Sequence, residues 1–237
     1  MSLNTTVAPD LPRRPPLRAG SLCMVLAVPV FLPLLLAAIT VQSVSLSPTT
    51  VQSGSSSTGT ATLSAISNGT VKVALFSSKP SLATVPAIIT MGKTKTRTET
   101  FPITTVAGQA GCATISAQVV GTGPRPGAQL FVQPTDPPGP ITLTLSGITV
   151  VAGGQPLPGF VTVFQSGSQG AVVQLSSSNP QVTVPASVTL HETEGGPFQA
   201  SLSVSAAVNA APTCAIITAT FRGSRSRALV KVAIISG

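Results

Sequence analysis

Charged side chains are scarce in this chain of 237 residues, because Asp, Glu, Lys and Arg together make up 8% of it, against ~25% in an ordinary soluble domain. The sequence also contains a single histidine, no tryptophan and no tyrosine. Scattered carboxylates exclude a calcium site built from clustered acids, and the lack of Trp and Tyr disfavours a platform of exposed rings for sugars. Uncharged polar side chains must therefore supply most of the polar surface.

Helical periodicity is missing as well. Beyond residue 40 no stretch places apolar residues at i, i+3, i+4 and i+7, whereas 21 glycines and 22 prolines interrupt the chain every few residues. Short strands joined by turns need such punctuation. Disorder is the rival interpretation of a Ser/Thr/Gly/Pro-rich chain, but the mean hydropathy is positive and disordered segments lack apolar residues to bury. We expect an all-β fold.

An almost wholly apolar run, residues 22–39, follows the basic residues Arg13, Arg14 and Arg18. Basic residues before an apolar core are the layout of a secretory signal, and the run approaches the ~20 residues that span a bilayer as a helix. Two prolines within it weaken a continuous span. Residues 1–40 are thus interpreted as a cleaved signal, a retained membrane anchor or a buried helix, and the run itself as an N-terminal apolar helix.

Two more specific signals fit less well. Arg13 and Arg14 leave a twin-arginine signal open, although the residues after them do not continue that motif. Cys23 is not a lipoprotein cysteine, because it opens the apolar run instead of closing it and follows Leu22 where a small residue belongs. A predicted strand at 228–234 leaves no room for a C-terminal sorting signal, so we expect any tether to be N-terminal.

The sequence repeats itself with a period of about one hundred residues. At an offset of 100, nine positions of the first copy meet the same residue type in the second: Val51, Gly54, Gly59, Thr62, Val73, Leu75, Ser77, Ser78 and Pro80. After short insertions Cys112 meets Cys214, and the last strand returns to the offset of 100. Insertions are tolerated in loops. We predict two homologous domains, 41–133 and 141–237 (the first and second repeat), joined by a proline-rich linker, 134–140.

Within each repeat apolar residues alternate with polar ones, as in the stretch from Ala113 to Val119. Period-two alternation puts one face of a strand on a core and the other toward water. About seven short strands in a segment of this length, with turns every 8–12 residues, are typical of a sandwich of two antiparallel sheets. Prolines such as Pro48, Pro80 and Pro86 are expected at strand ends, where no ladder bond is lost.

The strings SLSPTTVQSGSSSTGTATLS, SSKPSLATVPA and SSSNPQVTVPASVTL resemble the immunoglobulin-like (Ig-like) repeats of large bacterial secreted and surface proteins. The resemblance covers nearly the whole chain after residue 40. It implies two tandem Ig-like β-sandwich domains acting as spacers, adhesion modules or appendages of secreted enzymes. It transfers no functional residue, and a sandwich fold by itself implies no activity.

Candidate catalytic residues are few. The first repeat has one acid, Glu99, and no histidine, whereas acid–base hydrolysis needs a carboxylate pair or a His-centred relay. In the second repeat His191, Glu192 and Glu194 stand close together, but on a strand the histidine faces away from both acids, which does not suit a metal. We expect a solvated loop there, no metal, no cofactor and no enzyme. The phenylalanines fall mostly within apolar alternation and are expected in the core rather than on a sugar-binding platform.

The two repeat cysteines, Cys112 and Cys214, occupy equivalent positions, so neither repeat can close its own bridge. Each lies out of phase with the buried positions that follow it, which indicates a boundary or outward site. Equivalent points of two stacked domains lie roughly 35–45 Å apart by compact-domain size, whereas a disulfide needs Cα atoms within ~7 Å. We therefore expect free thiols, with an intermolecular bridge as the alternative.

The chain is basic, with a formal net charge of +8. The basic residues form two groups, one predicted to share a strand face and the other to surround the last turn and strand: Lys93, Lys95 and Arg97, then Arg222, Arg225, Arg227 and Lys231. Such groups could contact an anionic polymer through screened electrostatics. Solubility and protection of edge strands are the plainer explanation.

The sequence thus predicts a non-catalytic, exported structural or adhesion protein, secreted or held in the cell envelope. The alternative is an extracellular module that binds an anionic polymer or glycan through the basic strand faces. No partner is specified beyond the membrane itself, which residues 22–39 would contact if uncleaved.

Overall fold

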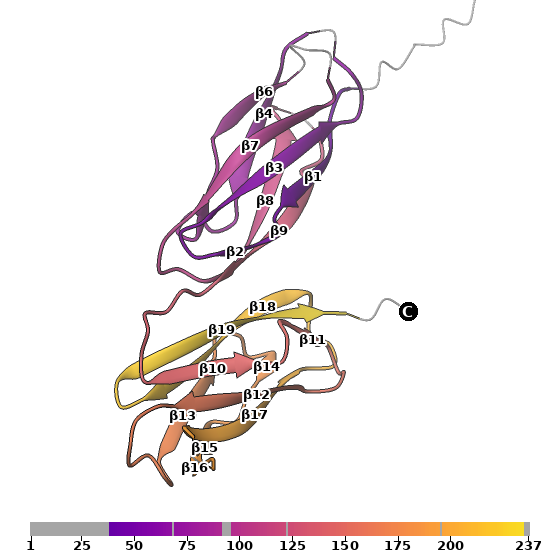
Figure 1. Ribbon diagram of the computed structural model, residues 1–237. Coiled ribbons are helices and arrows are strands. Elements are labelled where there is room, and N and C mark those ends of the chain that lie inside the picture. Colours follow the sequence, from indigo (N-terminus) through magenta and orange to yellow (C-terminus); the bar gives the residue numbers. More distant parts are fainter. Residues whose placement is uncertain (1–37, 68, 92–95, 122, 195, 235–237) are drawn as a thin grey trace, which may run out of the picture. The chain divides into compact units, whose positions relative to one another are not determined.

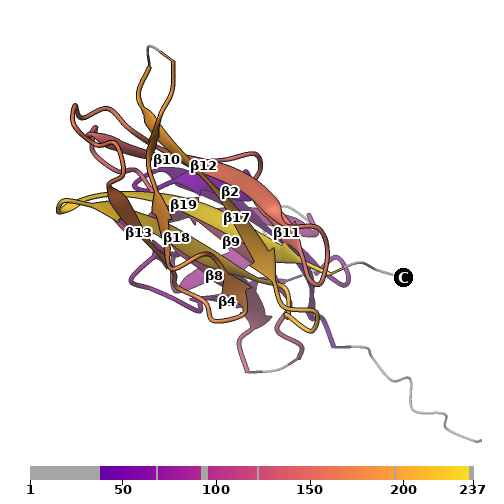
Figure 2. The same cartoon turned by 90° about the horizontal axis from the view of Figure 1, so that it is seen from below.

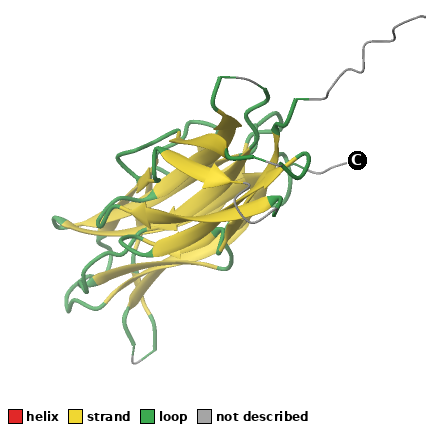
Figure 3. Cartoon of the chain, turned by 90° about the horizontal axis from the view of Figure 1, so that it is seen from above, coloured by secondary structure: helices red, strands yellow, loops and turns green. Residues whose placement is uncertain are grey.

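The computed structural model describes residues 38–67, 69–91, 96–121, 123–194 and 196–234. Residues 22–37 of the predicted apolar helix and membrane contact (residues 22–39) lie outside these ranges, as do Lys93 and Lys95, and Ala38 and Ile39 belong to no regular element. Regular secondary structure in the described residues consists of strands (Figure 3). Among them no helix is long and apolar enough to cross a membrane.

The first repeat forms two sheets. One has the order β1-β3-β7-β5, with the strands β1 (Val41–Ser47), β3 (Ser56–Leu63), β7 (Thr98–Thr105) and β5 (Ala83–Thr84). The other has the order β2-β9-β8-β4-β6, with β2 (Thr50–Gln52), β9 (Gly127–Gln133), β8 (Gly111–Val119), β4 (Val71–Ser77) and β6 (Ile88–Met91). Strand β2 runs parallel to β9, and the other pairs are antiparallel (Figure 1).

The second repeat has the same two sheets. One has the order β10-β12-β17-β14, with β10 (Ile141–Leu145), β12 (Leu157–Val163), β17 (Phe198–Ala206) and β14 (Val182–Thr183), and β16 (His191–Glu192) also pairs with β17. The other has the order β11-β19-β18-β13-β15, with β11 (Thr149–Val151), β19 (Ser224–Ala233), β18 (Thr213–Phe221), β13 (Val172–Ser177) and β15 (Ser187–Thr189). Strand β11 runs parallel to β19, as β2 does to β9.

This strand order confirms the Ig-like sandwich topology in both repeats. A four-stranded sheet faces a sheet whose short first strand runs parallel to its last, and the Greek-key connections match. Only β16 has no counterpart in the described part of the first repeat. The division of the chain into domains at 41–133 and 141–237 remains a prediction, although the sheets follow the repeat.

Each repeat has a core of its own. One cluster of buried apolar side chains runs from Val41 to Val132 and the other from Ile141 to Val232. The alternation read from the sequence is visible in the burial of β3, where every second residue is buried from Ser57 to Leu63. Apolar burial contributes about 25 cal/mol per Å², so the sequence pattern itself specifies the two cores.

Gly59 and Gly159 mark a close approach inside each sandwich. An ideal Cβ on Gly59 would lie 2.2 Å from Cζ of Phe101, a side chain that is 2% exposed. On Gly159 it would lie 2.7 Å from the backbone oxygen of Thr144 and 2.6 Å from Leu145. Real Cβ atoms do not come so close, so glycine leaves room for a neighbour's side chain in both repeats, from β7 in one and from β10 in the other.

The repeated serines after β4 and β13 extend the pairing of these strands with their neighbours β8 and β18. Ser78 donates its backbone N–H to the carbonyl of Thr114 (3.0 Å) and accepts the Thr114 N–H at Oγ (2.8 Å). Ser178 forms the same pair of bonds with Ile216, at 3.0 and 2.9 Å. A serine hydroxyl thus replaces a backbone acceptor where the strand ends. Thr114 and Ile216 each lie two residues beyond a repeat cysteine.

Candidate functional site

The first and second repeats are covalently joined by a disulfide between Cys112 and Cys214, whose Cα atoms lie 6.1 Å apart. The expectation of free thiols is therefore wrong. It assumed repeats stacked by translation, which would separate equivalent positions by a domain length. Instead equivalent positions meet, as in an isologous contact between the copies of a symmetric dimer. Both cysteines are half-buried at the second residue of their strands, which agrees with the predicted boundary position.

The cross-strand neighbours of the two cysteines also meet. Phe131 pairs with Cys112 on β9, and Lys231 pairs with Cys214 on β19. The Nζ of Lys231 lies 4.1 Å from the centre of the Phe131 ring and donates to Oγ1 of Thr50 at 2.7 Å. A cation over a ring face is attracted by the ring quadrupole. Desolvation at this contact lowers the pKa of Lys231 from the ordinary lysine value.

An ion pair links the second repeat to the linker. Arg227 donates from Nε to Oδ1 of Asp136 (2.7 Å) and from its backbone N–H to Oδ2 (2.6 Å). Its Nη1 also donates to the carbonyl of Gly108 in the first repeat, at 3.4 Å. The side chains of Arg227 and Asp136 are 15% and 12% exposed. Among the described residues this is the only ion pair, and its shielding from water strengthens the attraction relative to a surface pair.

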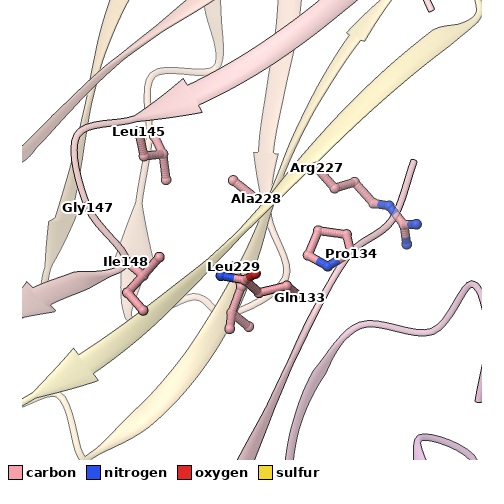
Figure 4. A pocket seen from close by; sticks show the side chains of 8 residues that line it. All are labelled: Gln133, Pro134, Leu145, Gly147, Ile148, Arg227, Ala228 and Leu229. Carbon is pink, nitrogen blue, oxygen red and sulfur yellow. The ribbon is translucent and has the colours of Figure 1, made fainter. Parts of the chain in front are cut away.

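We call this set of contacts the junction: Cys112–Cys214, Lys231 with Thr50 and Phe131, and Arg227 with Asp136 and Gly108. A cavity of about 380 Å³ borders the disulfide, lined by polar residues that include Lys79, Ser178 and Asn179. A smaller cavity of about 190 Å³ lies beside the linker (Figure 4), where Leu145, Ile148 and Leu229 face Gln133 and Pro134. The smaller one is below the usual ~300 Å³ of a ligand pocket.

The predicted polyanion contacts fall in different places. Arg227 lies at the junction, where its guanidinium donates to Asp136 and to the carbonyl of Gly108. Arg97 stands in a bend before β7, where its guanidinium donates to the carbonyls of Leu63 and Ser64 and to Gln42. Arg222 and Arg225 are exposed near the β18–β19 turn. The polymer contact itself remains a prediction.

His191 and Glu192 form the short strand β16 instead of the expected loop, and both are exposed. The hairpin they belong to projects from the second repeat (Figure 2). In the described part of the chain, no group of three or more His, Cys, Asp or Glu side chains is arranged to hold a metal ion.

Two phenylalanines correct the expectation that these residues belong to the core. Phe160 is 43% exposed and Phe164 63% exposed, whereas Phe101 and Phe221 are buried. Phe164 and Phe198 line a cavity of about 450 Å³ that also includes Glu192. Phe160 alternates out of phase with the inward residues of β12, a signal that the sequence carried.

The junction was missed by reasoning from the sequence, with the exception of its cysteines, which were identified but not paired. Gly127 and Phe131 of the first repeat correspond to Arg227 and Lys231 of the second at the offset of 100. The replacement of Gly and Phe by charged residues at matched positions was a signal that could have indicated the junction. Nothing in the sequence pointed to Asp136 as the partner of Arg227.

No protein-family model matches the chain, and no curated protein matches it. Solved structures similar to it include the D0-D1 domain of intimin, 13% identical over 82% of this chain and 96% of that chain, with a TM-score of 0.37. Domains 5-6 of the S-layer protein SbsC are 13% identical over 84% and 100%, with a TM-score of 0.30. A protein of unknown function from Porphyromonas gingivalis W83 is 10% identical over 81% and 98%, with a TM-score of 0.35. The chain resembles tandem Ig-like domain proteins, and this similarity concerns the fold alone.

Proposed function

We propose that this protein is a non-catalytic, exported spacer whose two repeats are held at a fixed mutual geometry by the junction. The observation that carries the proposal is the disulfide between Cys112 and Cys214, together with the noncovalent contacts around it. Domains joined only by a linker move relative to each other by default. A covalent bridge on one side and the linker on the other restrict that movement.

The disulfide also supports export. Structural disulfides form and persist in oxidising compartments such as the periplasm or the extracellular space, and are rare in the cytosol. The bridge therefore agrees with the secretory layout of the N-terminus, from an independent observation. An adhesive role at the cell surface is a natural extension of a rigid spacer.

Rigidity can be tested by measuring a distance distribution between two spin labels. The labels are attached through unnatural amino acids at Thr100 and Ser201, exposed residues on the outer sheet faces of the first and second repeat, so that no cysteine is added. We expect one narrow distribution in the oxidised protein and a broad one in the Cys112→Ser/Cys214→Ser variant. An equally broad distribution in both proteins would contradict the proposal.

A second candidate function, binding of an anionic polymer, is supported by the exposure of Arg222 and Arg225. Heparin serves as the probe, and its affinity should fall steeply with salt because neutralised anionic groups release counterions. Replacing both arginines by Ser should flatten this salt dependence without unfolding the protein. Arg97 is unsuitable for the test because its guanidinium supports backbone carbonyls. Weak binding that is insensitive to the double substitution argues against this function.

A further inference from the structure

We infer that the Cys112–Cys214 disulfide is a second covalent connection between the repeats, which carries tension past the linker and survives cleavage of the linker. The inference rests on the proposed spacer role, since both require the bridge to be closed. It adds a mechanical function that rigidity alone does not imply.

The bridge closes a large covalent loop. The two cysteines are separated by 102 residues in the sequence, and the chain between them contains most of β8, all of β9, the linker and all strands from β10 to β17. The linker, residues 134–140, lies wholly inside this loop. It is therefore no longer the sole covalent path between the repeats.

The path of a pulling force follows from this topology. Tension applied to the two ends of the chain runs along β1 to β7, enters Cys112, crosses the disulfide and leaves from Cys214 along β18 and β19. The strands β10 to β17 lie inside the closed loop, so they carry no tension between the ends. If either repeat unfolds under load, the loop cannot be drawn out.

The position of the bridge makes this path short. Cys112 and Cys214 lie at the starts of β8 and β18, and their cross-strand partners Phe131 and Lys231 are in contact beside them. Val132 and Val232, one residue further along, are near the ends of β9 and β19. The force thus enters and leaves the junction next to the last strand of each repeat.

The first experiment measures contour length by single-molecule force spectroscopy on the full chain, with a peptide handle fused to each end. A fully extended chain spans about 3.4 Å per residue. With the loop of 102 residues closed, the oxidised protein should unfold to a length roughly 350 Å shorter than the same protein in reductant. The Cys112→Ser/Cys214→Ser variant should give the long value under both conditions. Equal lengths with and without reductant would overturn the inference.

The second experiment cuts the linker chemically. Asp136–Pro137 is the only Asp–Pro bond of the sequence, and mild acid hydrolyses such bonds selectively while disulfides survive. After hydrolysis of the full chain we expect one species of undiminished mass on a non-reducing gel and two fragments after reduction. The Cys112→Ser variant is the matched control and should separate without reductant. Separation of the wild-type fragments without reductant contradicts the inference.

The outcomes keep the two proposals apart. A broad distance distribution together with the short contour length would leave the mechanical connection standing and remove the rigid spacer. A narrow distribution with the long contour length would overturn the inference and would mean that noncovalent contacts alone hold the mutual geometry of the repeats. Fragments of the Cys112→Ser variant that stay joined would show that Cys23 makes the connection, and would overturn the assignment to Cys112.

Discussion

The two repeats share their strand order but differ at the positions that form the junction. Equivalent sites carry Gly127 and Phe131 on β9 but Arg227 and Lys231 on β19. The second repeat thus supplies both cations, and the first repeat and the linker supply the ring, the hydroxyl and the carboxylate that receive them. Positions that the repeats share specify the sandwich, and positions at which they differ specify how the sandwiches are joined.

The largest expected effect comes from removing the two cysteines, of which each repeat contributes one. The Cys112→Ser/Cys214→Ser variant should lose about 4 kcal/mol in the free energy of unfolding, because a cross-link that closes a loop of ~100 residues restricts the unfolded chain. Urea unfolding under non-reducing conditions measures this loss, and wild type in reductant should match the variant. A variant as stable as the oxidised wild type would contradict the structural role of the bridge.

Next in size is the pair of core glycines, which share a role but face different obstacles. Gly59→Ala and Gly159→Ala should each destabilise the protein by about 2–3 kcal/mol through overpacking. Adding Phe101→Leu should offset much of the Gly59→Ala loss, because the obstacle is a side chain. Leu145→Ala should not rescue Gly159→Ala to the same degree, since the backbone oxygen of Thr144 remains. Thermal unfolding of the four variants and two double variants gives the coupling energies.

The asymmetric ion pair has a smaller effect. Asp136→Asn keeps the size of the side chain but removes the charge that accepts two bonds from Arg227, and should cost about 2 kcal/mol, as expected for hydrogen bonds to a charged group. Arg225→Ala, on the same strand and exposed, is the matched control and should change stability by less than about 0.5 kcal/mol. If both variants lost the same stability, the Arg227–Asp136 ion pair would contribute no more to folding than an exposed arginine does.

The smallest effect concerns Lys231, which has no cationic counterpart in the first repeat. Burial lowers its pKa in the folded protein, so between the folded and unfolded pKa values the unfolded chain binds more protons. Stability attributable to this group therefore rises as pH increases toward 10.5. Wild type should gain stability relative to Lys231→Met between pH 8 and pH 10.5, measured by urea unfolding.

Much of the fold was predictable because each short strand follows the same local pattern, in which apolar and polar residues alternate. Alternation in the stretch from Ala113 to Val119 identified β8, and the offset of 100 paired the strands of one repeat with those of the other. The exposure of Phe160 could have been predicted from the alternation of β12, in which it lies out of phase with the buried residues, whereas Phe164 lies beyond the end of that strand, where no alternation indicates a face.

The candidate site was less predictable than the fold. Arg227 looked like a free cation in the sequence, since its partner Asp136 is 91 residues away in a linker with no regular pattern. Arg97 looked like a member of a solvent-facing strand, yet it lies in a bend and supports the end of β3. Hydrogen-bond partners at such separations depend on loop paths, which have no periodicity to read.

By itself the sequence determined the all-β class, the repeat and the burial pattern of its strands, because apolar alternation acts between residues close together in the chain. Only the tertiary structure decided how the repeats meet. Whether Cys112 and Cys214 lie 6.1 Å apart or a domain length apart depends on the spatial relation of one folded repeat to the other. A few side chains at the junction set that relation, and no local pattern encodes it.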